Sequence, residues 1–97
     1  MSYANLIQRQ DLISGLRELA DFLESNPEVP APPEITAIVF PPQATNAEKR
    51  REIDAIASRI GSGTVTRPAC LHYFTSRSFG TVEYRAVAIP AGPAEEA

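Results

Sequence analysis

The spacing of the apolar residues changes once along the chain, and this change constrains the fold more than any other feature. Up to Gly63, apolar residues recur every three or four positions in two segments, which predicts two amphipathic helices. After Gly63 they recur with a period near two, which predicts strands. A chain that combines both patterns is expected to form an α+β protein.

The first helix is predicted from four leucines spaced four, three and four residues apart, with further apolar residues beside them: Leu12, Leu16, Leu19 and Leu23, flanked by Ile13, Ala20 and Phe22. We expect this stripe to be buried on one side of the helix. Asn26 and Pro27 end the helix, because Asn tolerates a left-handed conformation and Pro cannot continue the hydrogen bonding. Glycine at position 15 destabilises a helix by about 1 kcal/mol relative to Ala. We therefore expect that the helix backbone packs closely against a strand at Gly15.

The second helix is marked at both of its ends. Thr45 and Glu48 have the spacing of a capping box, and Gly61 is the residue expected after the last helical turn. Between these signals, four apolar residues predict the buried face: Ile53, Ile56, Ala57 and Ile60.

Four segments are expected to form strands. Ile35–Phe40 is almost continuously apolar, which favours a strand in the middle of the sheet, buried on both faces. Thr64–Thr66 is expected to be a short strand, and Leu71–Arg77 and Thr81–Ile89 are expected to form a hairpin.

The hairpin turn is predicted at Phe79-Gly80. This turn places Thr75 opposite Tyr84 and Tyr73 opposite Ala86. Because side chains alternate along a strand, Tyr73, Tyr84 and Ala86 are then expected on one face of the sheet.

The element order helix, strand, helix and three strands predicts a two-layer α+β sandwich, in which two helices pack on one face of a small mixed or antiparallel sheet. A chain of 97 residues has room for one core, so we expect one domain over residues 1–90. Residues 91–97 contain small and acidic side chains, and we expect them to form a disordered acidic tail.

The composition indicates the cellular compartment in which we expect the protein. No apolar run approaches the ~20 residues that span a membrane, and no signal peptide is visible. The single cysteine fits a reducing compartment. We therefore expect a cytoplasmic protein with no membrane partner.

Two segments carry a resemblance to known proteins. Gly15–Glu24 reads GLRELADFLE and is followed by Asn26-Pro27, and Phe79–Ile89 reads FGTVEYRAVAI. Together they resemble small proteins of actinobacterial chromosomes and of their bacteriophages or integrated elements, over about Gln8 to Pro90. The resemblance implies a phage or mobile-element setting inside a bacterial cell. That family has no assigned activity, so it supplies no functional residue.

No group of residues has the pattern of a catalytic, cofactor-binding or metal site. Cys70 and His72 lie two positions apart, but zinc needs three or four protein ligands and no further donor has ligand spacing. Side chains two apart on a strand are ~7 Å from each other, too far for a nucleophile and its base. We therefore expect no enzyme activity, no cofactor and no metal.

A binding role is the remaining hypothesis, and the distribution of charged residues indicates where a partner binds. Residues 1–34 hold two basic and six acidic side chains, a net charge of −4, whereas residues 49–85 hold seven basic and three acidic ones, a net charge of +4. The expected contact residues for a partner are Lys49, Arg50, Arg51, Arg77, Phe79 and Arg85.

The predicted partner is a protein, with self-association as a homodimer through the sheet edge or the hairpin as one form. The alternative is a nucleic acid, bound by the basic second half of the chain. In that alternative Tyr73 and Tyr84 stack on bases.

Overall fold

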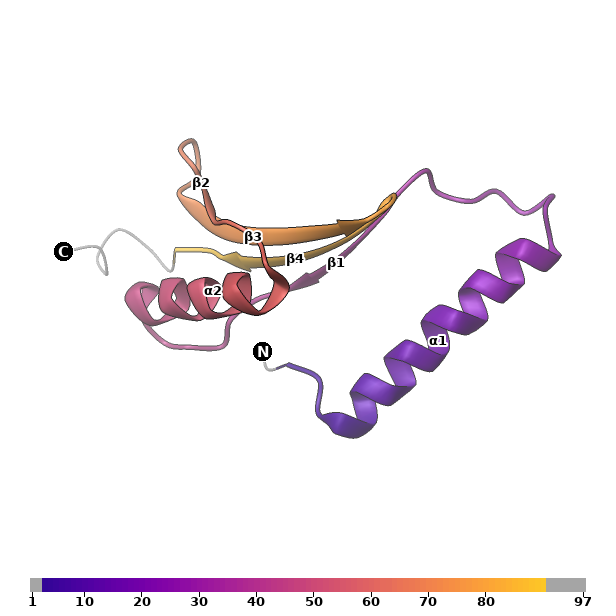
Figure 1. The fold of residues 1–97 in the computed structure, drawn as a ribbon, viewed down its shortest axis with the longest axis horizontal. Helices are drawn as coiled ribbons and strands as arrows, with labels where there is room; N and C mark the ends of the chain where they lie inside the picture. The colour runs from indigo at the N-terminus through magenta and orange to yellow at the C-terminus, as the bar shows by residue number, and fades with distance from the viewer. Residues whose placement is uncertain (1–2, 91–97) are drawn as a thin grey trace. The chain divides into compact units, whose positions relative to one another are not determined.

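The structure, a computed structural model, describes residues 3–90, which divide into two compact units. Ala4–Pro33 form one unit, and Tyr3 with residues 34–90 forms the other. The elements are α1 (Leu6–Ser25), β1 (Ile35–Val39), α2 (Asn46–Ile60), β2 (Val65–Arg67), β3 (His72–Phe79) and β4 (Val82–Ala88) (Figure 1). The α+β class with a mixed sheet is confirmed. The acidic tail predicted for residues 91–97 lies outside the described residues.

Helix α1 begins at a reciprocal cap. The side chain of Asn5 accepts a hydrogen bond from the Gln8 amide (2.8 Å), and the Gln8 side chain accepts one from the Asn5 amide (2.9 Å). At the other end, the side-chain Nδ2 of Asn26 donates a hydrogen bond to the Phe22 carbonyl oxygen (2.8 Å). None of the 20 residues of α1 is buried, and nothing in its own unit, Ala4–Pro33, covers the leucine stripe. The burial of this stripe against the sheet stays a prediction, because α1 and the sheet belong to different units.

The four-stranded sheet has the order β1-β4-β3-β2, with β1 parallel to β4 and the other pairs antiparallel. Strand β1 is therefore an edge strand, and Thr36, Ala37 and Ile38 are exposed. The prediction that this segment is a central strand buried on both faces is wrong. A short apolar run predicts a strand, but it does not predict whether that strand lies at the centre or at the edge of the sheet.

The hairpin of β3 and β4 turns at Gly80-Thr81, one residue later than predicted. Gly80 adopts a left-handed φ of 67°, a conformation that glycine enters without a steric penalty. Thr75 is therefore paired with Ala86 and Tyr73 with Ala88. The predicted pairs are wrong by two residues, but a shift of two returns every side chain to its predicted face.

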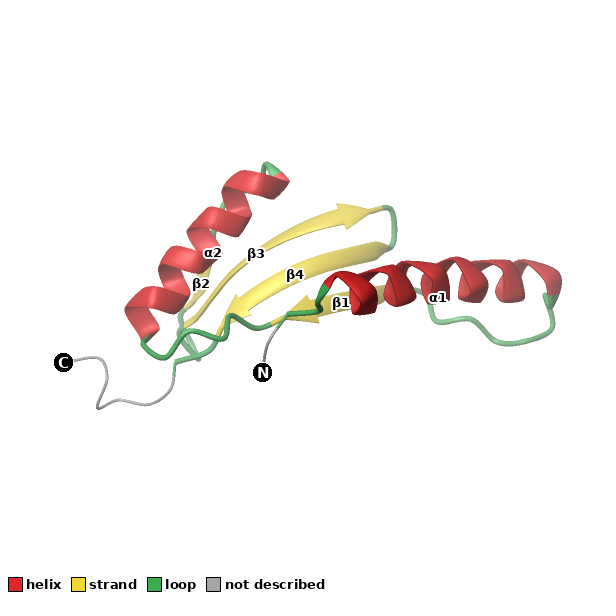
Figure 2. Ribbon diagram, turned by 90° about the horizontal axis from the view of Figure 1, so that it is seen from below, coloured by secondary structure: helices red, strands yellow, loops and turns green. Residues whose placement is uncertain are grey.

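Helix α2 packs against β3 and β4 and covers one face of the sheet (Figure 2). Its predicted capping box at Thr45 and Glu48 is confirmed, and Gly61 closes it in a left-handed conformation. The buried core joins helix and sheet: Ile53, Ile56, Ala86 and Ala88, with Val39, Ile60, Tyr73 and Tyr84 packed against it. That α1 forms a second helix on the same face stays a prediction, because α1 belongs to the other unit.

Candidate functional site

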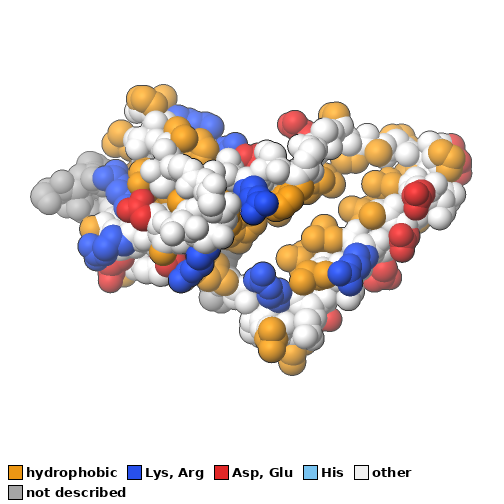
Figure 3. Space-filling model, in the orientation of Figure 1, with side chains coloured by type: hydrophobic (Ala, Val, Ile, Leu, Met, Phe, Trp, Pro, Cys, Tyr) orange, Lys and Arg blue, Asp and Glu red, His pale blue; other side chains and the backbone are white. Residues whose placement is uncertain are grey.

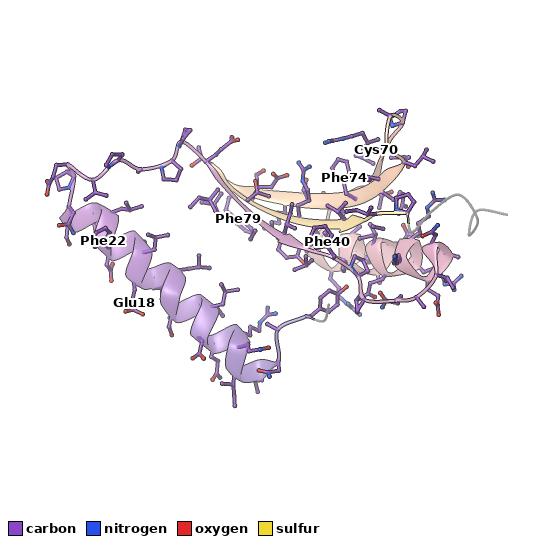
Figure 4. The ribbon with its side chains drawn as sticks, turned by 180° about the vertical axis from the view of Figure 1, so that it is seen from behind. Glu18, Phe22, Phe40, Cys70, Phe74 and Phe79 are labelled. Atoms are coloured by element: carbon purple, nitrogen blue, oxygen red, sulfur yellow. The ribbon has the colours of Figure 1, made fainter. Side chains whose placement is uncertain are left out.

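The six residues predicted to contact a partner fall in three separate places of the sheet unit. Lys49, Arg50 and Arg51 lie in the first half of α2, near the end of β4. Helix α2 ends near Ser76, whose carbonyl oxygen accepts a hydrogen bond from the Ser62 hydroxyl (2.7 Å). Phe79 lies three residues further along β3, at the opposite end of the sheet from the first half of α2 (Figure 4).

Arg85 lies on the sheet face that α2 leaves uncovered. Its neighbours Tyr84 and Ala86 pack against the core, and alternation along β4 points Arg85 the other way. Its guanidinium forms an ion pair with Glu83 (3.0 Å) and lies 4.7 Å from the centre of the Phe74 ring. Arg67 lies over the same ring at 5.6 Å.

The pKa of Glu83 reflects its contact with Arg85. The hydrogen bond from Arg85 is the main reason that the pKa of the Glu83 carboxyl lies below its ordinary value. The hydroxyl of Thr36 in the neighbouring strand also donates to Glu83 (3.3 Å). Arg85 is thus engaged within the sheet, and its charge is partly neutralised.

Phe79 lies at the end of the hairpin. Its side chain is 58% exposed, and the Arg77 guanidinium lies 5.1 Å from the centre of its ring. Arg77 is exposed as well. The ring therefore faces solvent on at least one side instead of folding over the sheet.

Tyr73 and Tyr84, the two predicted base-stacking residues, lie on the face that α2 covers and pack against the core. The Tyr73 hydroxyl donates a hydrogen bond to Asp54 of α2 and lies 3.0 Å from the Thr64 hydroxyl. The bond to Asp54 favours the neutral phenol and raises the pKa of Tyr73. The Arg50 guanidinium lies over the Tyr73 ring at 6.0 Å. These contacts make Tyr73 a structural link between sheet and helix.

Cys70 and His72 lie in different surroundings. Cys70 is exposed in the turn that precedes β3, whereas His72 is half-buried at the start of β3. Within residues 3–90, no three side chains among His, Cys, Asp and Glu are placed to hold one metal ion.

Three hollows on the described surface are each small or open. One hollow, lined by Asn46, Leu71 and Ile89 among others, has a volume of about 10 Å³, and one beside Thr36 and Gly80 has about 100 Å³. Pockets that enclose drug-sized ligands have about 300–1,000 Å³. A larger depression beside Leu19 and Phe22 is an open surface of α1.

Comparison with known proteins adds no homologue. No protein-family model, no curated protein and no solved structure matches the chain. Neither helix within residues 3–90 has the length and apolar character needed to cross a membrane.

The surface that sequence reasoning missed is α1. Five large apolar side chains of its stripe are unusually exposed, between 39% and 57%: Leu12, Ile13, Leu16, Leu19 and Phe22. Figure 3 shows hydrophobic side chains along one edge of the helix and acidic side chains along the other. The sequence predicts the apolar stripe itself, but its spacing does not indicate whether the same chain or another one covers it.

Proposed function

We propose that the chain is a non-enzymatic protein-binding module, and that the apolar face of α1 is its binding surface. By this face we mean six side chains: Leu12, Ile13, Leu16, Leu19, Phe22 and Leu23. The observation that carries the proposal is that no residue of this 20-residue amphipathic helix is buried and that nothing in its own unit, Ala4–Pro33, covers its apolar face.

A helix of this kind needs a covering partner. In proteins, most of the stability of a helix comes from packing of its amphipathic face and not from intrinsic helix propensity. Leu16, Leu19 and Phe22 are each about half exposed, at 49%, 42% and 50%. A contiguous apolar patch that solvent reaches is a typical feature of an interaction surface.

The charge of α1 favours a protein over other partners. Its polar side carries Asp11, Glu18, Asp21 and Glu24, against Arg17. Helices that bind membrane surfaces are rich in Lys and Arg on this side, and phosphate backbones also attract cations. An acidic polar side disfavours both, whereas an apolar protein surface is compatible with it.

The proposed setting is the interior of a bacterial cell, in a protein of bacteriophage or mobile-element type. This part of the proposal rests on the resemblance carried by Gly15–Glu24 and Phe79–Ile89.

The test is capture of partners by the tagged full chain, with and without nuclease, in three versions. The double variant Leu16→Glu/Leu19→Glu removes the apolar face, and Gln10→Glu/Ser14→Glu adds the same charge on the opposite side of α1. We expect a stoichiometric protein that survives nuclease and is lost only with the first variant. Equal capture by both variants, or loss of all prey on nuclease treatment, would contradict the proposal.

Nucleic-acid binding is the second candidate, and one observation favours it. The guanidinium groups of Arg67 and Arg85 lie 5.6 and 4.7 Å from the centre of the Phe74 ring, on the sheet face that α2 leaves uncovered. An aromatic ring beside cations is a feature of sites where bases stack. The ion pair of Arg85 with Glu83 weakens this candidate.

Binding of a labelled single-stranded oligonucleotide at increasing salt tests this second candidate. If Lys49, Arg50 and Arg51 contact phosphates, their joint replacement by Ala lowers the affinity and flattens its salt dependence. The matched control is Arg9→Ala/Arg17→Ala on α1. No binding of the oligonucleotide by the wild-type chain removes the candidate, and no change in affinity or slope with the triple variant removes Lys49, Arg50 and Arg51 as its phosphate contacts.

A further inference from the structure

We propose that the partner of α1 is the α1 helix of a second copy of this chain, and that the two helices pair antiparallel about a two-fold axis. This inference rests on the proposed function and names its partner. In the pair, Leu16 of one copy lies opposite Leu19 of the other, and Leu12 lies opposite Leu23.

The spacing of the leucines sets the contact line between the helices. Intervals of four, three and four residues are those of positions a and d in a heptad, which form the seam of two paired helices. Gly15 and Phe22 flank this seam on one side, and Ile13 and Ala20 flank it on the other. All four flanking residues are apolar or small, so none places a charge beside the seam.

Side-chain sizes across the seam favour the antiparallel direction. Antiparallel pairing brings Phe22 against Gly15 of the second copy and Ile13 against its Ala20, a large residue beside a small one in both cases. Parallel pairing brings Gly15 against Ala20 and leaves space that no side chain fills. Interfaces of this kind need packing close to that of a protein interior.

No contact within its own unit explains why residue 15 is a glycine. A Cβ added there would meet no atom within 4 Å, so no close contact inside the described chain requires glycine. A mid-helix glycine nevertheless destabilises the helix by about 1 kcal/mol relative to Ala. Docking of Phe22 from a second copy supplies the close approach that this glycine permits.

Charge along α1 also favours the antiparallel direction. Acidic residues gather in the second half, at Glu18, Asp21 and Glu24, whereas Arg9 lies in the first half at a seam position. In the register that sets Leu12 opposite Leu23, antiparallel pairing places Arg9 opposite Asn26, beside the acidic second half of the other helix, and it does so twice by symmetry. Parallel pairing instead sets Arg9 against Arg9.

The available area suits a small but specific dimer. A 20-residue helix is ~30 Å long, and its half-exposed apolar face offers on the order of 500 Å². Two copies then bury on the order of 1,000 Å², which is the lower range for a specific interface.

The association state of the full chain is the first test, measured by sedimentation velocity over a wide concentration range. We expect a concentration-dependent dimer that Leu16→Glu/Leu19→Glu converts to a monomer and that Gln10→Glu/Ser14→Glu leaves intact. A wild-type chain that stays monomeric throughout overturns the inference, and so does a dimer that both variants retain.

The direction of pairing is tested by disulfide formation in a Cys70→Ser background, which removes the exposed native thiol. Leu12→Cys and Leu23→Cys chains are oxidised separately and as a mixture. We expect a disulfide-linked dimer only in the mixture. A linked dimer of the Leu12→Cys chain alone overturns the antiparallel arrangement.

The role of Gly15 is tested by Gly15→Leu, with Ser14→Leu on the outer side as the matched control. Because the second copy approaches Gly15 closely, we expect the larger side chain to weaken the dimer by about tenfold or more. Equal affinity of both variants and the wild type overturns the proposed contact with Phe22.

The failure of this inference can be told apart from failure of the proposed function. A monomeric chain that still captures a nuclease-resistant protein through α1 overturns only the self-pairing. A monomeric chain whose α1 amides are strongly protected from hydrogen exchange overturns both, because the chain then covers its own helix.

Discussion

The hydroxyl of Thr75, in the middle of β3, donates a 2.8 Å hydrogen bond to the carbonyl oxygen of Gly63, in the loop between α2 and β2. Thr75 is 1% exposed and is among the most buried side chains described. The bond therefore ties the loop after α2 to the central part of the sheet. A buried hydroxyl without a partner is destabilising, so this contact satisfies Thr75 as well as fixing the loop.

Thr75→Val tests this contact with almost no change in side-chain shape. We expect the free energy of unfolding to fall by about 1 kcal/mol, because the Gly63 carbonyl loses its donor while solvent can still reach it. Urea denaturation measures the change. Thr75→Ser keeps the hydroxyl and is the control for hydrogen bonding. A Thr75→Val variant as stable as the wild type would show that the bond contributes nothing.

Local patterns predicted the sheet unit well, because its signals lie within a few residues of one another. Thr45, Glu48 and Gly61 set the ends of α2 through hydrogen bonds to their own helix. The hairpin faces also followed from alternation. Its turn was misplaced because Gly80 can occupy more than one turn position, and only the observed pairing selects between them.

Long-range contacts could not be predicted in the same way. The edge position of β1 depends on its parallel pairing with β4, more than 40 residues away in the chain. For the candidate site, charge alone grouped Lys49, Arg77 and Arg85, although the fold separates them. The exposure of α1 was missed because an apolar stripe has the same pattern whether its own chain or another one covers it.

Substitutions at Leu71 test whether the backbone is strained in the turn before β3. It is the one described residue other than glycine with a positive φ, 57°, and its amide donates to the Arg67 carbonyl oxygen (2.7 Å). We expect Leu71→Gly to be more stable than Leu71→Ala by about 1 kcal/mol, the reverse of the usual order, because only glycine enters this region freely. Thermal unfolding of both variants measures the difference. An Ala variant as stable as the Gly variant would rule out strain at this position.

Glu48 gives a pH prediction. Hydrogen bonds from the Thr45 side chain and then its backbone amide hold the pKa of Glu48 below its ordinary value of 4.5. A carboxyl with a lowered folded-state pKa contributes stability above its unfolded pKa and loses it as the pH falls through the folded value. We therefore expect Glu48→Gln to flatten the acid side of the pH–stability curve.

An NMR titration of the Glu48 carboxyl measures this pKa directly. Thr45→Ala is the matched variant, because it removes the side-chain donor and is expected to return the pKa toward 4.5. A wild-type titration at the ordinary value contradicts the prediction.

Phe79 separates two models of self-association. The ring is 58% exposed and is paired across the strands only with Val82. We expect Phe79→Ala to lower the free energy of unfolding by less than about 1 kcal/mol, whereas Ile53→Ala, at a fully buried position, lowers it by about 2–5 kcal/mol. If copies associate through α1, the Phe79→Ala chain keeps the wild-type dimer affinity in sedimentation experiments. If they associate through the hairpin, the affinity falls although the fold is intact, because an exposed aromatic ring is then the anchor of the interface.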